Sequence, residues 1–107
     1  LLAEAVTLAK NAGIDPAKVP EALKGGYADS PMFQRFFPRM IERDFNPAGY
    51  ARQVLKDLDM VVDLAQQTNT PVPMSSQSTA LYRVLIAKGH SELDATAILK
   101  IYDDQTL

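Results

Sequence analysis

The sequence predicts an all-α domain of five to seven antiparallel-packed helices. Apolar residues recur at intervals of three and four, prolines and glycines punctuate these stretches, and no stretch alternates apolar and polar residues between hairpin turns. The chain has 107 residues, of which 47% are hydrophobic, so we expect one domain that spans residues 1–107. Connections of two to six residues predict antiparallel neighbours around a shared core.

The first helix is expected over residues 1–12 and should end at Gly13, which suits a left-handed C-terminal position. Its predicted apolar stripe consists of Leu1, Ala5, Leu8 and Ala12. The helical pattern is already running at Leu1, with no residue before it to cap the first turn. We therefore expect that the chain is truncated inside its first long helix.

Two cap-and-proline pairs predict the next helices. Asp15-Pro16 predicts a helix that runs until Gly25-Gly26. Ser30-Pro31 predicts a helix through residue 43, which Pro38 should kink or divide into two short helices. The large apolar side chains of this segment are expected in the core of the domain: Met32, Phe33, Phe36, Phe37, Met40 and Ile41.

After a turn at residues 44–49, the strongest helical pattern runs from Tyr50 to about Thr68. Its expected stripe consists of Val54, Leu58, Val61 and Ala65, widened by Leu55 and Val62. Pro71 and Pro73 suit the first turn of the following helix, which should end at Gly89. The pattern of that helix is carried by Met74, Ser78, Leu81 and Leu85.

Ser91 and Asp94 resemble a capping box at the start of the last helix. That helix is expected to bury Ala95, Ile98, Leu99 and Tyr102. The final residues of the chain are polar enough that we expect them to fray.

Charge and composition exclude several functions. The net charge is −2, and the 11 Lys and Arg residues are scattered, so nucleic acid is not expected as a partner. The absence of Cys removes disulfides, thiolate metal sites and thiol nucleophiles, and is compatible with the cytoplasm, where we expect the protein. The apolar runs are only a few residues long, so no membrane partner is expected.

Two groups of polar residues could suggest chemistry but have simpler interpretations. His90, Ser91 and Asp94 could be imagined as a catalytic triad, but a helix break followed by a cap explains all three. Asp57, Asp59 and Asp63 lie at spacings that scatter their carboxylates around a helix. A solvated face is therefore expected, and no metal site.

Lys56 has two interpretations. It points about 170° from the centre of the predicted apolar stripe, so packing does not require it. It could be an ordinary surface lysine. It could also be a compact ammonium group on a rigid helix, available to a carboxylate or phosphate ligand.

Four stretches resemble a known family: YARQVLKDLDMVVD (50–63), preceded by PRMIERDFNPAGY (38–50) and followed by TPVPMSSQ (70–77) and GHSELDATAI (89–98). Together they resemble the β-hydroxyacid dehydrogenase family, which includes 3-hydroxyisobutyrate dehydrogenases, 2-hydroxy-3-oxopropionate reductases and L-threonate dehydrogenases. The resemblance spans essentially the whole chain. It implies a helical domain like the C-terminal domain of 6-phosphogluconate dehydrogenase.

In this family a long helix joins that domain to an N-terminal dinucleotide-binding domain, which carries G-x-G-x-x-G. The sequence contains no G-x-G-x-x-G. The resemblance therefore implies that such a domain is the partner of this chain, and that the family's catalytic lysine lies upstream of Leu1. It also implies NAD or NADP as cofactor and a small hydroxy acid as substrate of the intact enzyme. We expect no cofactor on residues 1–107 alone.

The resemblance also assigns roles to individual residues. Lys56 matches the lysine of a K-D-L motif that reaches towards the nicotinamide cofactor, which implies a cofactor-binding role. Tyr50 stands in the place of an aromatic residue, usually Phe, that walls the substrate pocket, but at six residues before Lys56 instead of seven. Asp94 and Thr96 match a D-x-S/T pattern, for which capping is a sufficient explanation.

The resemblance thus predicts the substrate-binding and subunit-contact domain of an NAD(P)-dependent 2- or 3-hydroxyacid dehydrogenase, without catalytic residues of its own. The alternative is a self-standing helical interaction or dimerisation module with no enzymatic role. In either case, the exposed apolar stripe of the first helix predicts a homodimer.

Overall fold

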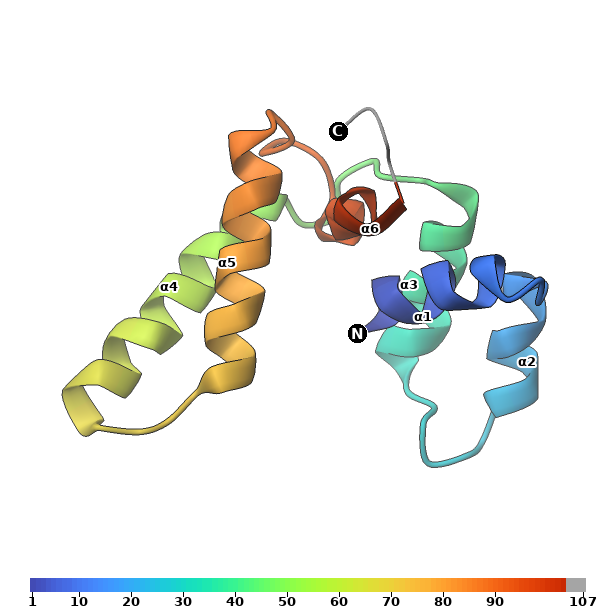
Figure 1. Ribbon diagram of the computed structural model, residues 1–107, viewed down its shortest axis with the longest axis horizontal. Coiled ribbons are helices and arrows are strands. Elements are labelled where there is room, and N and C mark those ends of the chain that lie inside the picture. Colours follow the sequence, from blue (N-terminus) through green and yellow to red (C-terminus); the bar gives the residue numbers. More distant parts are fainter. Residues whose placement is uncertain (104–107) are drawn as a thin grey trace.

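The computed structural model describes residues 1–103, which form helices joined by turns (Figure 1). The elements are α1 (Leu2–Asn11), η1 (Pro16–Lys18), α2 (Val19–Leu23), α3 (Pro31–Glu42), α4 (Ala51–Thr68), α5 (Pro73–Ala87), η2 (Ala95–Leu99) and α6 (Lys100–Asp103), where η marks 3₁₀ helices. Over residues 1–103, β-type pairing is limited to one isolated bridge between Tyr50 and Asp94. The all-α prediction is confirmed, whereas the predicted fraying of the last four residues lies outside the described range.

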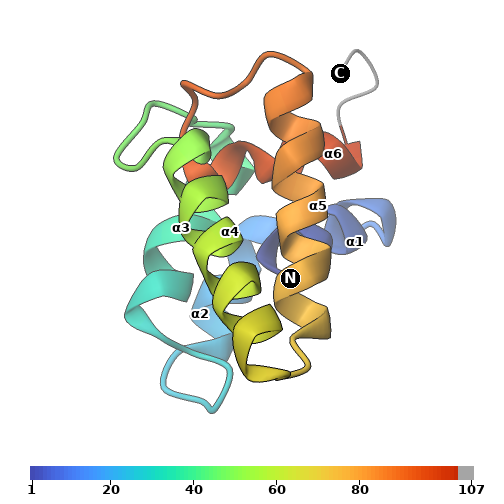
Figure 2. The same ribbon diagram turned by 90° about the vertical axis from the view of Figure 1, so that its left-hand side faces the viewer.

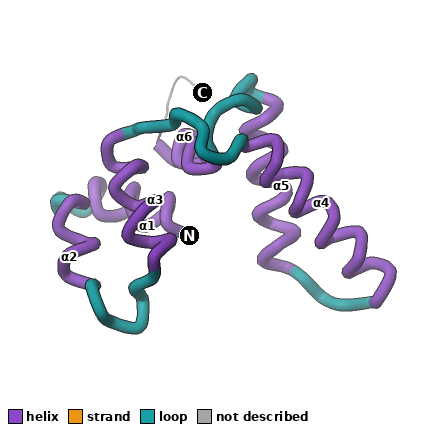
Figure 3. Tube along the Cα trace, turned by 180° about the vertical axis from the view of Figure 1, so that it is seen from behind, coloured by secondary structure: helices purple, strands orange, loops and turns teal. Residues whose placement is uncertain are grey.

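The helices form two parts, which we call the body and the arm. The body consists of α1, α2 and α3, and the arm is the antiparallel hairpin of α4 and α5 (Figures 1 and 2). Over residues 1–103, both arm helices contact η2, and α5 also contacts α6, but neither approaches α1, α2 or α3. Figure 3 shows from behind that the arm projects from the body and meets it at one end only. No helix in this range is long and apolar enough to cross a membrane.

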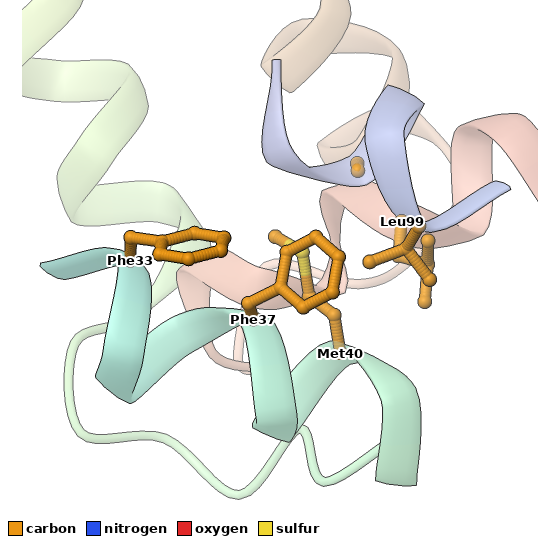
Figure 4. Close-up of a cluster of buried hydrophobic side chains, with 6 residues drawn as sticks. Phe33, Phe37, Met40 and Leu99 are labelled. Carbon is orange, nitrogen blue, oxygen red and sulfur yellow. The ribbon is translucent and has the colours of Figure 1, made fainter. Parts of the chain in front are cut away.

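Each part has its own buried cluster, so the expectation of one shared core is wrong. The cluster of the body consists of Ala3, Val6, Phe33, Phe37, Met40 and Leu99 (Figure 4). The cluster at the base of the arm consists of Ala51, Leu85 and Ala97. Phe45 and Ile98 pack against both clusters. These two side chains therefore join the arm to the body through apolar contacts.

Helix α1 buries a face other than its predicted apolar stripe. Its buried residues are Ala3, Val6 and Ala9, whereas Leu1, Ala5, Leu8 and Ala12 are exposed. The helix rests on small side chains, which allow close approach to α3 and η2. The predicted apolar stripe is therefore exposed, as the expectation of a homodimer assumed, and the core is formed by another face of the helix. The predicted end of the helix is confirmed, since Gly13 has a φ of +76°.

The two proline-led segments differ from the prediction in length and continuity. Asp15 caps the first of them as predicted, but a 3₁₀ turn comes before α2 and the helix ends at Leu23, short of Gly25-Gly26. The second, α3, is capped by Ser30 and runs undivided through Pro38. A proline inside a helix costs about 3 kcal/mol or more, and we attribute the continuity to the burial of the residues around it in the body cluster.

The buried face of the arm is rotated from the predicted stripe. On α4 the buried residues are Ala51, Leu55 and Ala65, and Val61 is 44% exposed. On α5, Leu85 is fully buried but Met74 is 81% exposed. The reason is that α4 and α5 have only each other and the base of the arm to pack against, so apolar residues on the free sides of the hairpin stay exposed.

Asp94 alone caps the start of η2, and Ser91 takes no part in the cap. The predicted capping box is therefore wrong. The carboxylate of Asp94 accepts hydrogen bonds from the backbone N–H and the hydroxyl of Thr96. Ser91 uses its carbonyl instead, to accept from the N–H of Arg52. The segment buries Thr96, Ala97 and Leu99, whereas Ala95, Ile98 and Tyr102 are half-buried.

Candidate functional site

Lys56 lies in the second turn of α4, on the outside of the arm. Its side chain is 69% exposed, and its Nζ lies 3.6 Å from a carboxylate oxygen of Asp57, which is also exposed. A surface ion pair of this kind contributes little and is readily exchanged for another anion. The ammonium group is therefore accessible to a ligand, while the 18-residue helix holds its backbone in place.

Tyr50 lies at the base of the arm, as the residue immediately before α4. Its backbone N–H donates to Oε1 of Gln53 at 3.3 Å. The guanidinium carbon of Arg52 lies 4.5 Å from the centre of the Tyr50 ring, and Nε of Arg52 donates to Glu92 at 2.9 Å. Tyr50 and Lys56 thus have separate partners, and the structure ties Tyr50 to the loop that precedes η2.

A groove of about 290 Å³ lies between the arm and the body. Its lining is mostly apolar and includes Leu2, Met32, Phe36, Val54, Tyr82 and Ile98. Lys56 and Tyr50 are not part of this lining, so the two predicted site residues lie elsewhere on the arm. A larger cavity of about 430 Å³, lined by Pro20, Gln34 and Pro38, belongs to the body and does not include them either.

The most connected polar group at the base of the arm is the carboxylate of Asp94, which is 2% exposed. Besides its bonds to Thr96, it accepts from the N–H groups of Ala48 and Gly49 at 2.8 and 3.2 Å. Nη1 of Arg39, from α3, lies 3.2 Å from it. The D-x-T pattern predicted the bonds to Thr96. Nothing in the sequence indicated Arg39 or the 48–49 loop as partners, because they precede Asp94 by more than 40 residues.

The environment of Asp94 keeps it ionised. Burial alone would raise its pKa, but the hydrogen bonds from Thr96, Ala48 and Gly49 outweigh burial and lower the pKa to about 2. Burial also raises the pKa of Tyr82 to about 12, and its hydroxyl donates to the carbonyl of Ala95. Both groups therefore keep one protonation state near neutral pH and hold structure at the base of the arm.

The other polar groups singled out in the sequence have the following partners. His90 uses its backbone N–H to bond the carbonyl of Leu85, while Asp94 is occupied by the partners described above. Asp59 pairs with Arg83 of α5 at 2.6 Å. Over residues 1–103, no group of three or more His, Cys, Asp or Glu side chains could hold a metal ion.

Residues 1–102 match the sequence profile of a family described as NAD-binding of NADP-dependent 3-hydroxyisobutyrate dehydrogenase. The chain is similar to a 2-hydroxy-3-oxopropionate reductase of Escherichia coli, with 33% identity over 92% of the chain and 34% of that protein. It is also similar to an L-threonate dehydrogenase of Cupriavidus necator, with 29% identity over 94% of the chain and 34% of that protein.

A solved structure of a 3-hydroxyisobutyrate dehydrogenase from Salmonella typhimurium shares the fold. It superposes with a TM-score of 0.87 at 27% identity, over 94% of this chain and 35% of that one. The chain therefore belongs to the NAD-binding family of 3-hydroxyisobutyrate dehydrogenase and its hydroxyacid dehydrogenase relatives. It spans about a third of the length of these relatives.

Proposed function

We propose that the chain is the helical C-terminal domain of an NAD(P)-dependent 2- or 3-hydroxyacid dehydrogenase. In that enzyme it would help to close the active site over the cofactor and a small hydroxy acid, or over the corresponding semialdehyde or oxo acid. The match to an NAD-binding family over residues 1–102 supports this proposal. The comparisons do not favour the alternative of a self-standing interaction module.

The observation that carries the proposal is the position of Lys56. It is an exposed cation on a long helix, and the only ion pair it makes within residues 1–103 is a weak one with neighbouring Asp57. A group of this kind can bind an anionic ligand without loss of packing. We assign it to contact with the cofactor or the carboxylate of the substrate. The hydride chemistry belongs to the cofactor itself.

The residues of this chain can supply one contact to a dinucleotide, but they do not form a complete binding site for it. Lys56 supplies a charge, but the sequence has no glycine-rich phosphate loop, and the arm–body groove is apolar. A separate dinucleotide-binding domain would have to hold most of the cofactor. The relatives are about three times as long as the chain, which leaves room for such a domain.

Two further roles belong to the proposal. Tyr50 would wall the substrate pocket, and its contact with Arg52 would hold the ring in place. A homodimer would use the exposed face of α1, where Leu1 is 93% and Leu8 is 70% exposed. The cytoplasmic location stays a prediction.

The test is the Lys56→Ala variant in the full-length enzyme. We expect KM for the cofactor or the substrate to rise roughly tenfold or more, because a hydrogen bond to a charged group contributes about 1.5–3 kcal/mol. The unfolding midpoint should stay nearly unchanged, since the side chain is exposed. Lys88→Ala is the matched control, because Lys88 is an exposed lysine at the end of α5.

Equal kinetics for the Lys56 and Lys88 variants would remove Lys56 from the site. A Lys56 variant that loses activity and thermal stability together would show a structural role instead. Titration of the 107-residue chain with NADH and with NADPH adds a second readout. We expect no binding and no turnover, and activity of the chain alone would contradict the division into two domains.

A further inference from the structure

The arm is attached to the body by two loops that run side by side. The loop of residues 43–50 leads from α3 into α4, and the loop of residues 88–94 leads from α5 into η2. Four backbone hydrogen bonds join these loops and the first residues of the helices that follow them: Asp94 N–H to Phe45 O, Ala95 N–H to Gly49 O, Ala51 N–H to Leu93 O, and Arg52 N–H to Ser91 O. The first turn of α4 is therefore bonded to the loop before η2, and not to the body helices.

The Asp94 carboxylate lies at the centre of this attachment. One of its oxygens receives the N–H groups of Ala48 and Gly49, and the other receives Thr96 at the start of η2. Arg39 connects this centre to the body, since it belongs to α3 and also donates from Nη2 to the carbonyl of Asn46. One charge pair, with Asp94 buried and the Arg39 side chain 17% exposed, thus links α3, the loop before α4, and η2.

We propose that Asp94, paired with Arg39, is the positioning group that sets the angle between the arm and the body. The backbones of α4 and α5 stay apart from α1, α2 and α3 within residues 1–103, so the arm is held at its base, by the two loops, η2 and α6, and the pair acts there. The apolar contacts of Phe45 and Ile98 hold the two parts together but are not directional. The hydrogen bonds to Asp94 are directional. The four backbone bonds are directional too, but none of them includes a body helix, whereas Asp94 is paired with Arg39 of α3.

This inference deepens the proposed function, because Lys56 is carried on the arm. α4 rises ~1.5 Å per residue, so a rotation of about 10° at its first turn would move the Lys56 backbone by roughly 1 Å and the far end of the helix by roughly 5 Å. A misplacement of about 1 Å is enough to lower activity strongly when a group must meet a ligand. Asp94 would thus act on the ligand through the position of Lys56, without touching the ligand.

The experiment measures the arm directly and does not depend on the enzymatic role. The chain has no cysteine, so spin labels can be attached at two introduced ones, Glu21→Cys on α2 of the body and Gln67→Cys near the far end of α4. Both positions are exposed, and the molecule measures 43 × 34 × 25 Å, which suits double electron–electron resonance. We expect a narrow distance distribution in the parent chain, and a broadened or shifted one after Asp94→Asn.

Two further variants keep the test decisive. Asp59→Asn removes the carboxylate of another Asp–Arg pair, which joins α4 to α5 within the arm, and should leave the distribution unchanged. Arg39→Gln removes only the link from Asp94 to α3 and should also broaden or shift the distance distribution. This variant replaces Asp94→Asn if that variant does not fold. Circular dichroism checks that helix content is retained.

The proposal is wrong if a folded Asp94→Asn chain shows the same distance distribution as the parent chain. If Asp94→Asn does not fold, an unchanged distribution in Arg39→Gln has the same meaning. An equal change in Asp59→Asn would overturn the proposal as well. A changed distribution in the Asp94 variant, together with normal kinetics of the Lys56 variant in the full-length enzyme, would retain the positioning role and reject the proposed function.

Discussion

The body and the arm bury their apolar side chains to different extents. The body surrounds its core with three helices and η2, and buries Phe33, Phe37 and Met40 in it. The arm has two helices with only each other and the base to pack against, and its buried cluster is three residues at the base. Large apolar side chains farther along the arm, such as Met60, Leu64 and Met74, are more than half exposed.

Helix length and helix burial are therefore separate properties. α4 is the longest helix of the described chain and has a regular apolar pattern, yet most of that pattern lies outside the core. A helix of 18 residues can hold its shape by its own hydrogen bonds and one neighbour. Its direction then depends on the base of the arm, where the polar network of Asp94 lies.

The largest expected effect tests whether the body carries most of the stability. Phe37 is fully buried, so Phe37→Ala should lower the free energy of unfolding by about 3–5 kcal/mol through lost contacts and a cavity. Urea denaturation followed by circular dichroism measures this loss. Met74→Ala on the arm is the control and should change stability by no more than about 0.5 kcal/mol, since Met74 is 81% exposed. Similar losses for both variants would contradict the contrast between body and arm.

An intermediate effect on stability is expected from Asp94, at the base that joins the arm to the body. The pKa of Asp94 is lowered to about 2 in the folded protein, from an ordinary value of 3.8. Its carboxylate therefore adds about 2 kcal/mol of stability above about pH 4, which is lost as the pH falls through about 2. Unfolding measured at several pH values should show this acid dependence in the parent chain and a flatter one in Asp94→Asn. Identical pH profiles would mean that the network does not favour the charged form.

The ion pair between the two arm helices has the smallest expected effect on stability. Asp59 and Arg83 join α4 to α5 at 2.6 Å, but their side chains are 44% and 59% exposed. Asp59→Asn should lower the free energy of unfolding by about 0–1 kcal/mol, because water screens an exposed ion pair. Thermal denaturation at low and high salt measures it, and the difference between parent and variant should shrink at high salt. A larger loss would show that the hairpin depends on this pair.

Local signals in the sequence predicted most of the secondary structure. Asp15 and Ser30 are caps, Gly13 ends α1, and the pattern after Tyr50 is one long helix, as predicted. Each of these features depends on residues within a few positions of one another, through hydrogen bonds that the side chain or backbone makes locally. The family was also predicted from the resemblance of short motifs, and the profile match confirmed it.

Only the tertiary structure decided which faces of the helices are buried. Leu1 and Leu8 have the spacing of a core stripe, yet α1 packs on Ala3 and Val6, because the small side chains let it approach α3. Val61 fits the stripe of α4 but has no neighbour to cover it. Hydrophobic periodicity identifies a helix, but burial depends on which surfaces meet, and that is not a local property.

By itself, the sequence determined an all-α chain, its main helix boundaries, its family and an exposed lysine at position 56. The division into body and arm, and the pairing of Asp94 with Arg39, came only from the tertiary structure. The physical reason is sequence separation. Helices and caps form between near neighbours, whereas the bonds between the two loops and to Arg39 join groups that lie 39 to 55 residues apart along the chain and meet only when the helices have packed.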